Sequence, residues 1–362
     1  MKAQMERLGI QMHGVNLTLE ADNPRLINYA SEHLQGMVTD TVHTPELLVR
    51  CYWSQGDWNP QANPFPRDGT LNVIGNRMLG RRDELIWLDT LRMRGLQLRF
   101  RRDGARFLFE AAYRFDPSRA STNPATYEYK KLFSLMRYLV YHPFVWYLRK
   151  FRGWTALHAS ALESEIGGII IAGLAGVGKS TTCVALMQKM GARIVSENLI
   201  LTNGRFIYSC YEPIRLDEGS LALLGNNANG LKPMEFPVGV KEKTLFHLKW
   251  QELPQAVKPV ALFLPEFRGS HYVRPLSPAL AAEKIIAING LVRELDDFEW
   301  YAAALDYLWP NVKLAPRPRE VLQRLTQHVR CLELGIDPSA GIQVVVDDIV
   351  GALTNAVATL RE

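Results

Sequence analysis

One short stretch near the middle of the chain constrains the fold more than any other. Residues 173–180 read G-L-A-G-V-G-K-S, which satisfies the pattern G-x-x-x-x-G-K-[S/T]. A predicted apolar strand (168–172) precedes it and a predicted helix (Lys179–Met190) follows, which is the context in which this pattern forms a phosphate-binding loop. Glycines let the backbone curl so that its N–H groups point at phosphate oxygens, and the helix N-terminus adds partial positive charge. We therefore predict that this segment binds a nucleoside triphosphate.

The residues of the motif divide between phosphate and metal binding. Lys179 is expected to reach the β and γ phosphates, and the hydroxyl of Ser180 to ligate Mg²⁺. We predict ATP as the ligand, although GTP stays an alternative because no base-reading motif is visible. The N-K-x-D motif of small GTPases and the L-S-G-G-Q-like signature of transporter ATPases are both absent from the sequence. The predicted nucleotide-binding residues are Gly173, Ala175, Gly176, Val177, Gly178, Lys179, Ser180 and Thr181.

Composition limits the partners that the chain needs. Its 362 residues are 47% hydrophobic and 22% charged, which is typical of a globular protein of about two domains. The net charge of +5 demands neither a nucleic acid nor a membrane partner. The apolar stretch 132–148 contains Arg137, His142 and Pro143, and we interpret it as a buried helix. With four scattered cysteines and no apolar N-terminal segment, we expect a cytoplasmic protein without a zinc site or a disulfide scaffold.

The first part of the chain, residues 1–126, predicts an α+β domain. Its clearest element is a hairpin of Leu96–Arg102 and Ala105–Tyr113 joined by Asp103-Gly104, because Gly tolerates the positive φ of such a turn. Many arginines crowd this hairpin and its flanks. We consider two interpretations, an ordinary sheet face or a docking surface for an acidic peptide, a phosphorylated metabolite or RNA.

The segment 116–126 is rich in Pro, Ser and Thr and predicts a linker. We place the second domain at residues 127–362 and expect a mixed α/β fold that begins with a helix near 127–150. Within it, 156–163 predicts one continuous strand. Asn203-Gly204 predicts a second two-residue hairpin turn.

Three segments together resemble the HPr kinase/phosphorylase family, and more closely its smaller relatives, the HPr kinase-like serine kinases. They are 157–161 (L-H-A-S-A), the loop motif, and 191–198 (G-A-R-I-V-S-E-N), and 212–216 (E-P-I-R-L) looks like the arginine-bearing strand of that family. The resemblance covers about residues 154–350. It implies a P-loop kinase fold related to phosphoenolpyruvate carboxykinase.

The same resemblance implies Mg²⁺-dependent transfer of the γ-phosphoryl group of ATP to a hydroxyl. The acceptor would be a protein serine or a small-molecule alcohol, which the N-terminal domain would select. The resemblance also allows a homo-oligomer. A P-loop enzyme that acts on nucleic acid is a further alternative that rests on the arginines of the hairpin alone.

The chain departs from the family at a pair of aspartates, which correspond here to Glu197 and Asn198. Glu197 keeps a carboxylate for Mg²⁺, but Asn198 cannot accept a proton at neutral pH. Glu197 itself could be the base, another acid such as Asp217 or Glu212 could replace it, or positioning and electrostatics could suffice. The alternative is a catalytically impaired nucleotide sensor.

Two further residues carry roles that the resemblance implies. His158 corresponds to a histidine before the P-loop strand, and the alternative is a strand-end histidine bonded to backbone. Arg215 would clamp a phosphate, or else is a solvated strand residue. We interpret Lys241, Lys243 and Arg268 as surface charge. The predicted catalytic residues are Lys179, Glu197, Asn198, His158 and Arg215, and the predicted metal ligands are Ser180 and Glu197.

Overall fold

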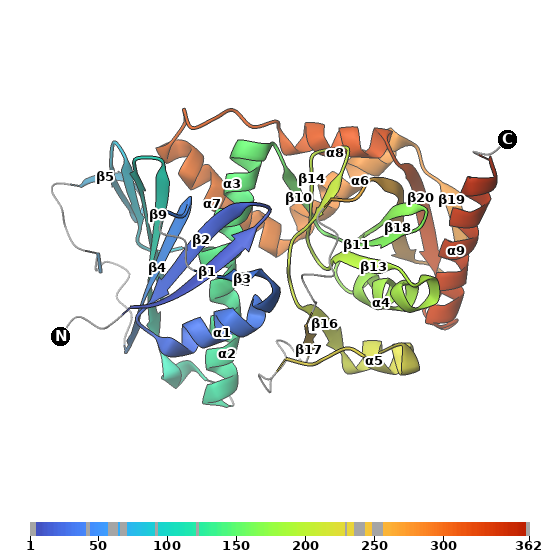
Figure 1. The fold of residues 1–362 in the computed structure, drawn as a ribbon, viewed down its shortest axis with the longest axis horizontal. Helices are drawn as coiled ribbons and strands as arrows, with labels where there is room; N and C mark the ends of the chain where they lie inside the picture. Colours follow the sequence, from blue (N-terminus) through green and yellow to red (C-terminus); the bar gives the residue numbers. More distant parts are fainter. Residues whose placement is uncertain are drawn as a thin grey trace. The chain divides into compact units, whose positions relative to one another are not determined.

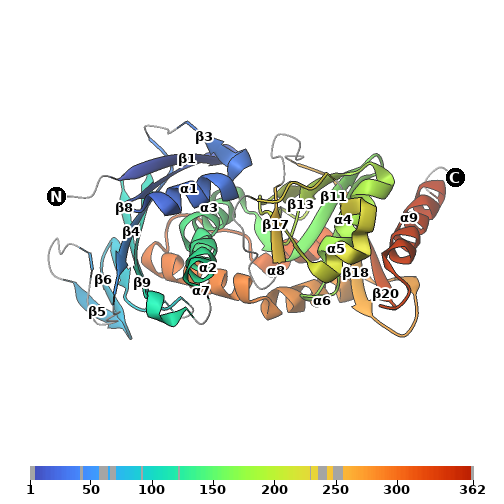
Figure 2. The same ribbon diagram turned by 90° about the horizontal axis from the view of Figure 1, so that it is seen from below.

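The computed structural model describes residues 5–40, 44–56, 64–65, 71–90, 93–120, 123–228, 230–234, 243–247 and 256–359. They form a mixed α/β fold with several sheets, shown in Figures 1 and 2. The chain divides into two compact units: unit 1 is Met1–Tyr147 with Asp297–Leu314, and unit 2 is Leu148–Asp296 with Ala315–Glu362. Within the described residues, no helix has both the length and the apolar character needed to cross a membrane.

This division differs from the boundary predicted between residues 126 and 127. The helix α2 (Pro124–Met136) and the π-helical turn Arg137–Tyr141 both fall in unit 1. The reason is packing, because aromatic side chains of this region contact the sheet and helix that precede them, as Tyr129 does with Tyr29 at 5.2 Å between ring centroids. Two helices, α3 (His142–Arg152) and α7 (Arg293–Leu308), begin in one unit and end in the other.

Unit 1 is built on a nine-stranded sheet in the order β3-β1-β2-β4-β9-β8-β7-β6-β5. The β2–β4 and β4–β9 pairs are parallel and the other neighbouring pairs are antiparallel. The predicted hairpin is present, but its two-residue turn is Gly104-Ala105 and not Asp103-Gly104, because Asp103 pairs with Arg106. Gly104 at this turn has φ +60°. The strands are β1 (Glu6–Met12), β2 (Val15–Ala21), β3 (Val38–Thr39), β4 (Leu47–Gln55), β5 (Asn72–Gly75), β6 (Met78–Arg81), β7 (Glu84–Trp87), β8 (Leu96–Asp103) and β9 (Arg106–Phe115), and the remaining helix is α1 (Pro24–His33).

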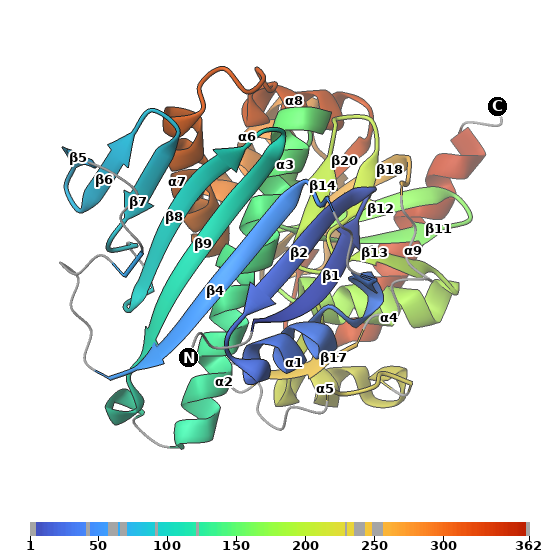
Figure 3. The ribbon, with the colours of Figure 1, turned by 60° about the vertical axis from the view of Figure 1, so that its left-hand side comes forward.

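Aromatic side chains fill the core between this sheet and its helices. Phe107 of β9 lies 4.9 Å from Trp146 of α3 and 5.1 Å from Trp309, measured between ring centroids. Phe100 of β8 meets Tyr301 of α7 edge-on at 5.2 Å. In Figure 3 the strands lie in front and the unit 1 parts of α3 and α7 lie behind them. The aromatic residues of the hairpin therefore pack a core.

Unit 2 contains a six-stranded sheet in the order β13-β11-β12-β18-β20-β19, in which β12, β18 and β20 run parallel. A three-stranded sheet (β10-β14-β15) and the pair β16–β17 accompany it. The strands are β10 (Thr155–Leu157), β11 (Ala159–Ser164), β12 (Gly167–Ala172), β13 (Arg193–Ser196), β14 (Ile200–Thr202), β15 (Ile207–Ser209), β16 (Ile214–Asp217), β17 (Lys243–Phe246), β18 (Pro259–Phe267), β19 (Tyr272–Pro275) and β20 (Arg330–Ile336).

Strand β12 lies at the centre of unit 2. Its residues Ile169, Ile170 and Ile171 have no exposed surface, so both faces are covered. One face packs with Ala281, Leu322 and other residues of the α6 and α8 helices. The helices of unit 2 are α4 (Lys179–Met190), α5 (Glu218–Leu224), α6 (Pro278–Leu291), α8 (Pro318–Gln327) and α9 (Ile342–Thr359).

Two local predictions for unit 2 are wrong. The strand predicted over 156–163 is two strands in two different sheets, β10 and β11, and the chain changes sheets at His158. The turn at Asn203-Gly204 is a four-residue loop, because Thr202 pairs with Ile207 and the Asn203 side chain accepts hydrogen bonds from the next N–H groups of the loop. This side-chain bonding stabilises a longer loop than the dipeptide suggested.

Candidate functional site

The predicted loop lies where the motif requires it, between β12 and α4. We call residues 173–178 the glycine-rich loop. Gly176 and Gly178 have φ of +85° and +87°, a region that residues with a side chain rarely adopt. A Cβ atom on Gly173 would lie 2.9 Å from Cγ1 of Val177, so this position also has no room for one. The loop therefore depends on glycine at three positions for two different reasons.

Lys179 begins α4 and folds back over the loop. Its buried Nζ donates hydrogen bonds to the carbonyl oxygens of Gly173 at 2.8 Å and Leu174 at 2.9 Å. Burial lowers the pKa of Lys179 to about 8, against the opposing effect of the Glu197 carboxylate, and the positive charge of Arg215 lowers it further. The ammonium group is thus still charged at neutral pH but easily neutralised above it.

Ser180 and Glu197 form the centre of the site. Glu197 follows β13, and its Oε1 accepts a short hydrogen bond from the hydroxyl of Ser180. Its second carboxylate oxygen, Oε2, is buried and has no hydrogen-bond partner among the described residues. A hydroxyl and a carboxylate with an unsatisfied oxygen are the oxygen donors that Mg²⁺ prefers.

A metal ion at this place would need ligands from a bound nucleotide as well as from the protein. Among the described residues, no cluster of three or more His, Cys, Asp or Glu side chains is arranged to hold a metal ion. Mg²⁺ typically takes one or two protein ligands and completes its shell with water and phosphate oxygens. Ser180 and Glu197 therefore fit a magnesium ion that arrives with a nucleotide.

Asn198 has a structural reason to be an asparagine. Its φ is +68°, in the left-handed region that Asn and Asp tolerate better than other residues with a side chain. Its Nδ2 donates a 2.6 Å hydrogen bond to Oε2 of Glu212. The amide thus holds a second carboxylate beside the position where the family resemblance places a base.

Asp217, the other acid considered from the sequence, is committed elsewhere. Its Oδ1 accepts a 2.8 Å hydrogen bond from the N–H of Ser220 and caps α5, and hydrogen bonds from Ser220 lower the pKa of Asp217. Its other oxygen lies 3.8 Å from Nζ of Lys243. Thr181, from the loop motif, donates to Oγ of Ser220 at 3.1 Å and so ties α4 to α5.

His158 lies at the switch between β10 and β11 and is 5% exposed. Neither nitrogen of its ring has a hydrogen-bond partner in the described part of the chain. Burial lowers the pKa of His158 to about 4, assisted by the charge of Lys179 and opposed by the carboxylate of Glu294. The main-chain N–H of His158 donates to Oδ1 of Asn289 at 3.0 Å.

One residue near the site, Glu294, was missed in the sequence, and another, Lys243, was interpreted as surface charge. Glu294, the second residue of α7, lies close enough to Lys179 and His158 to raise the pKa of each. Lys243, interpreted as surface charge, lies close enough to Lys179 to lower its pKa. Both come from segments far along the chain from the motif, and no local pattern marks them. Arg268 is half-exposed and paired with Glu266, whereas Lys241 lies outside the described residues.

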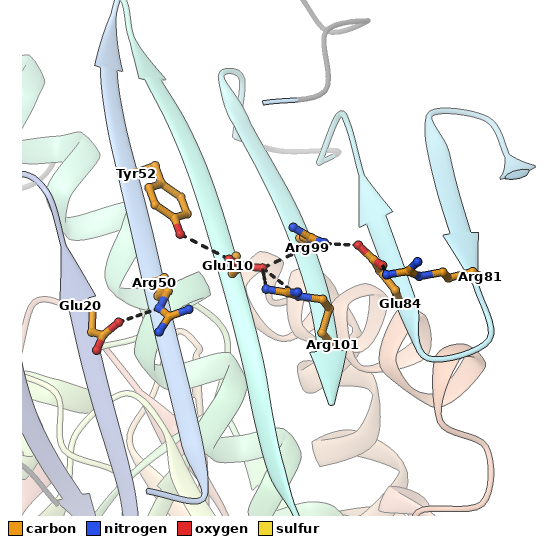
Figure 4. Close-up of polar contacts among 8 residues, drawn as sticks. All are labelled: Glu20, Arg50, Tyr52, Arg81, Glu84, Arg99, Arg101 and Glu110. Atoms are coloured by element: carbon orange, nitrogen blue, oxygen red, sulfur yellow. Dashed lines mark hydrogen bonds and ion pairs between the residues drawn. The ribbon is translucent and has the colours of Figure 1, made fainter. Parts of the chain in front are cut away.

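The arginines of the unit 1 hairpin do not form a free basic patch. Arg99, 1% exposed, contacts Glu84 at 2.6 Å, and Arg101 contacts Glu110 at 2.9 Å. Figure 4 shows these pairs as part of a line of alternating charges across neighbouring strands of the sheet. Much of the positive charge is therefore neutralised within the sheet itself. The residues drawn are Glu20, Arg50, Tyr52, Arg81, Glu84, Arg99, Arg101 and Glu110.

Comparisons with known proteins give little beyond a weak likeness. No protein-family model matches the chain, and no curated protein matches it. Among solved structures, the Hpr(Ser) kinase/phosphatase from Coxiella burnetii aligns with 57% of this chain and 99% of that chain. The sequence identity is 8% and the TM-score is 0.26.

Proposed function

We propose that this chain is a Mg²⁺-dependent kinase that transfers the γ-phosphoryl group of ATP to a hydroxyl acceptor. The observation that carries the proposal is the Ser180–Glu197 pair, with one unsatisfied carboxylate oxygen, beside a glycine-rich loop and its lysine. The acceptor is a protein serine or a small-molecule alcohol.

Each group of the site has a role in this reaction. The N–H groups of the glycine-rich loop bind the phosphates, and Lys179 exchanges its two carbonyl partners for phosphate oxygens. Mg²⁺, held by Ser180 and Glu197, would neutralise charge on the phosphates. Arg215 adds positive charge on the same side, since it lowers the pKa of both Lys179 and His158.

The proton of the acceptor hydroxyl needs a base that Asn198 cannot supply. Glu212, held by the amide of Asn198 at 2.6 Å, is the carboxylate that takes this role in the proposal. The acceptor oxygen forms a bond to the γ-phosphorus, the bond from that phosphorus to the bridging oxygen breaks, and the proton passes to Glu212. His158 is the second candidate, because a pKa near 4 keeps its ring neutral and able to accept a proton.

Transfer of label tests the proposal directly. Purified chain is incubated with γ-labelled ATP, Mg²⁺ and a desalted lysate of the source organism supplemented with its metabolite fraction, and the products are separated by size. We expect label in a protein band or in the small-molecule fraction, lost in Lys179→Ala and kept in Lys189→Ala, which removes an exposed lysine of the same helix. ATP binding without lysine-dependent label would refute the kinase.

The alternative function is a nucleotide sensor that transfers nothing. The conformation of Asn198 favours it, because an asparagine in the left-handed region needs no catalytic explanation. Asn198→Asp separates the two, since Asp also tolerates this region and restores a carboxylate. A kinase that uses position 198 keeps or gains rate with this change, whereas a sensor binds ATP unchanged and still transfers nothing. A kinase whose base is Glu212 loses rate, because the change removes the amide that donates to Glu212. Glu212→Gln is expected to lower kcat about 100-fold with ATP affinity unchanged if Glu212 is the base.

A further inference from the structure

A cavity of about 520 Å³ lies against the glycine-rich loop in unit 2. Three segments form its walls: the loop itself, the end of β18 and the last turns of α6. The volume is in the range of small-molecule sites, about 300–1,000 Å³. The lining residues are Ala172, Gly173, Leu174, Ala175, Val177, Leu264, Pro265, Glu266, Phe267, Lys284, Ala287, Ile288 and Leu291.

The cavity wall is apolar, and much of it is open to solvent. Leu174 is 50% exposed, Phe267 54% and Leu291 73%, although large apolar side chains are usually buried. The polar side chains among the lining residues are Glu266 and Lys284, and they form an ion pair with each other. The cavity therefore offers an aromatic ring and aliphatic groups to a ligand, and its charges are already paired.

The cavity shares the loop with the phosphate site but none of its charged groups. Lys179, Ser180 and Glu197 are absent from its lining, as are His158 and Arg215. A nucleotide whose phosphates lie against Lys179 and Ser180 has its nucleoside outside this charged group. The apolar cavity begins at the same loop residues, Gly173, Leu174, Ala175 and Val177.

We propose that this cavity binds the purine base and adjoining ribose of the nucleotide, with the base stacked on Phe267. The inference rests on the proposed function, because it needs the phosphates to be bound at the loop. Since the polar lining side chains are committed to each other, stacking and apolar contact dominate, and we expect ATP and GTP to bind with similar affinity.

Tripolyphosphate separates base binding from phosphate binding, because it carries the phosphates without a nucleoside. The Kd of Mg-ATP and of Mg-tripolyphosphate is measured by calorimetry for the wild type, Phe267→Ala and Leu291→Ala. We expect Phe267→Ala to weaken ATP about tenfold, since a base–aromatic stack contributes about 1–3 kcal/mol, while tripolyphosphate changes less than about twofold. Ala287→Trp, which fills the cavity instead of enlarging it, is expected to weaken ATP in the same selective way.

Matched controls use exposed residues of the same type outside the cavity. Phe206 is 40% exposed and Leu280, on the same helix as Leu291, is 49% exposed, and their alanine variants are expected to bind both ligands as the wild type does. Equal weakening of both ligands by Phe267→Ala, or unchanged ATP affinity in Phe267→Ala and Ala287→Trp, would overturn the inference alone. A wild type that binds neither ligand would overturn the proposed function as well.

Discussion

In the proposed nucleotide site, the lowered pKa of Lys179 should make nucleotide affinity depend on pH in a way that an exposed lysine would not. A lysine is charged below its pKa, so the phosphate-binding form of Lys179 predominates below pH 8 and is lost as the pH rises through it. Bound phosphates favour the ammonium and return its pKa toward the ordinary value of 10.5. Between about pH 7 and about pH 9.5 the free site loses most of its charge, which weakens ATP binding about thirtyfold.

The assay is a titration of Mg-ATP into the purified chain at several pH values across this range. Lys179→Arg is the control, because a guanidinium stays charged throughout and its affinity should vary little. A second control is far-UV circular dichroism at each pH, which reports whether the fold is intact. Lys179→Ala should bind weakly at every pH and show no such slope.

Two results would refute this reasoning. A wild-type affinity that stays constant up to about pH 9.5 would mean that the pKa of Lys179 is not lowered in the free site. An equal fall in Lys179→Arg would assign the pH dependence to a group other than Lys179.

Three more perturbations follow from buried groups. His158 should cost the wild type about 2.5 kcal/mol of stability between about pH 7.5 and about pH 4.5, because with a folded-state pKa near 4 the unfolded state takes up the proton first as the pH falls below 6.5. His158→Leu should lose that much less stability over the same range, as measured by denaturant melts at both pH values. Gly173→Ala should lower stability by about 1–3 kcal/mol, partly recovered by adding Val177→Ala, and full stability of the single variant would contradict the close contact. Glu84→Gln should cost about 2 kcal/mol because buried Arg99 loses the nearer of its two carboxylates and keeps only Glu110 at 3.6 Å, and a loss as small as that of an exposed ion pair would count against the buried network.

The sequence predicted best where the determinants are local. The glycine-rich loop, its helix from Lys179 and the hairpin that turns at Gly104 each lie within a few residues of the pattern that predicts them. The alternation of apolar residues, by contrast, continues through His158, so it cannot show that β10 and β11 belong to different sheets. The change of sheet depends on tertiary contacts: β10 pairs with β14, β11 pairs with β12, and Asn289 bonds to the backbone at 156 and 158.

The environment of the site could not be predicted, because it depends on contacts between distant segments. Glu294 and Lys243 reach Lys179 from other parts of the chain. The partners of the hairpin arginines depend on strand register, since Arg99 of β8 pairs with Glu110 of β9 on one side and with Glu84 of β7 on the other. A count of charges along the sequence therefore overestimates the charge that unit 1 offers to a partner.

The last segment of unit 1, Asp297–Leu314, lies late in the sequence, and this determines when unit 1 can fold during translation. Its aromatic core needs Tyr301 against Phe100 and Trp309 against Phe107, yet all of the chain between Tyr147 and Asp297 belongs to unit 2. Most N-terminal domains fold while the rest of the chain is still being made. Here the ribosome must synthesise the greater part of unit 2 before the first unit can close its core, so a nascent chain stalled before α7 exposes an open aromatic surface.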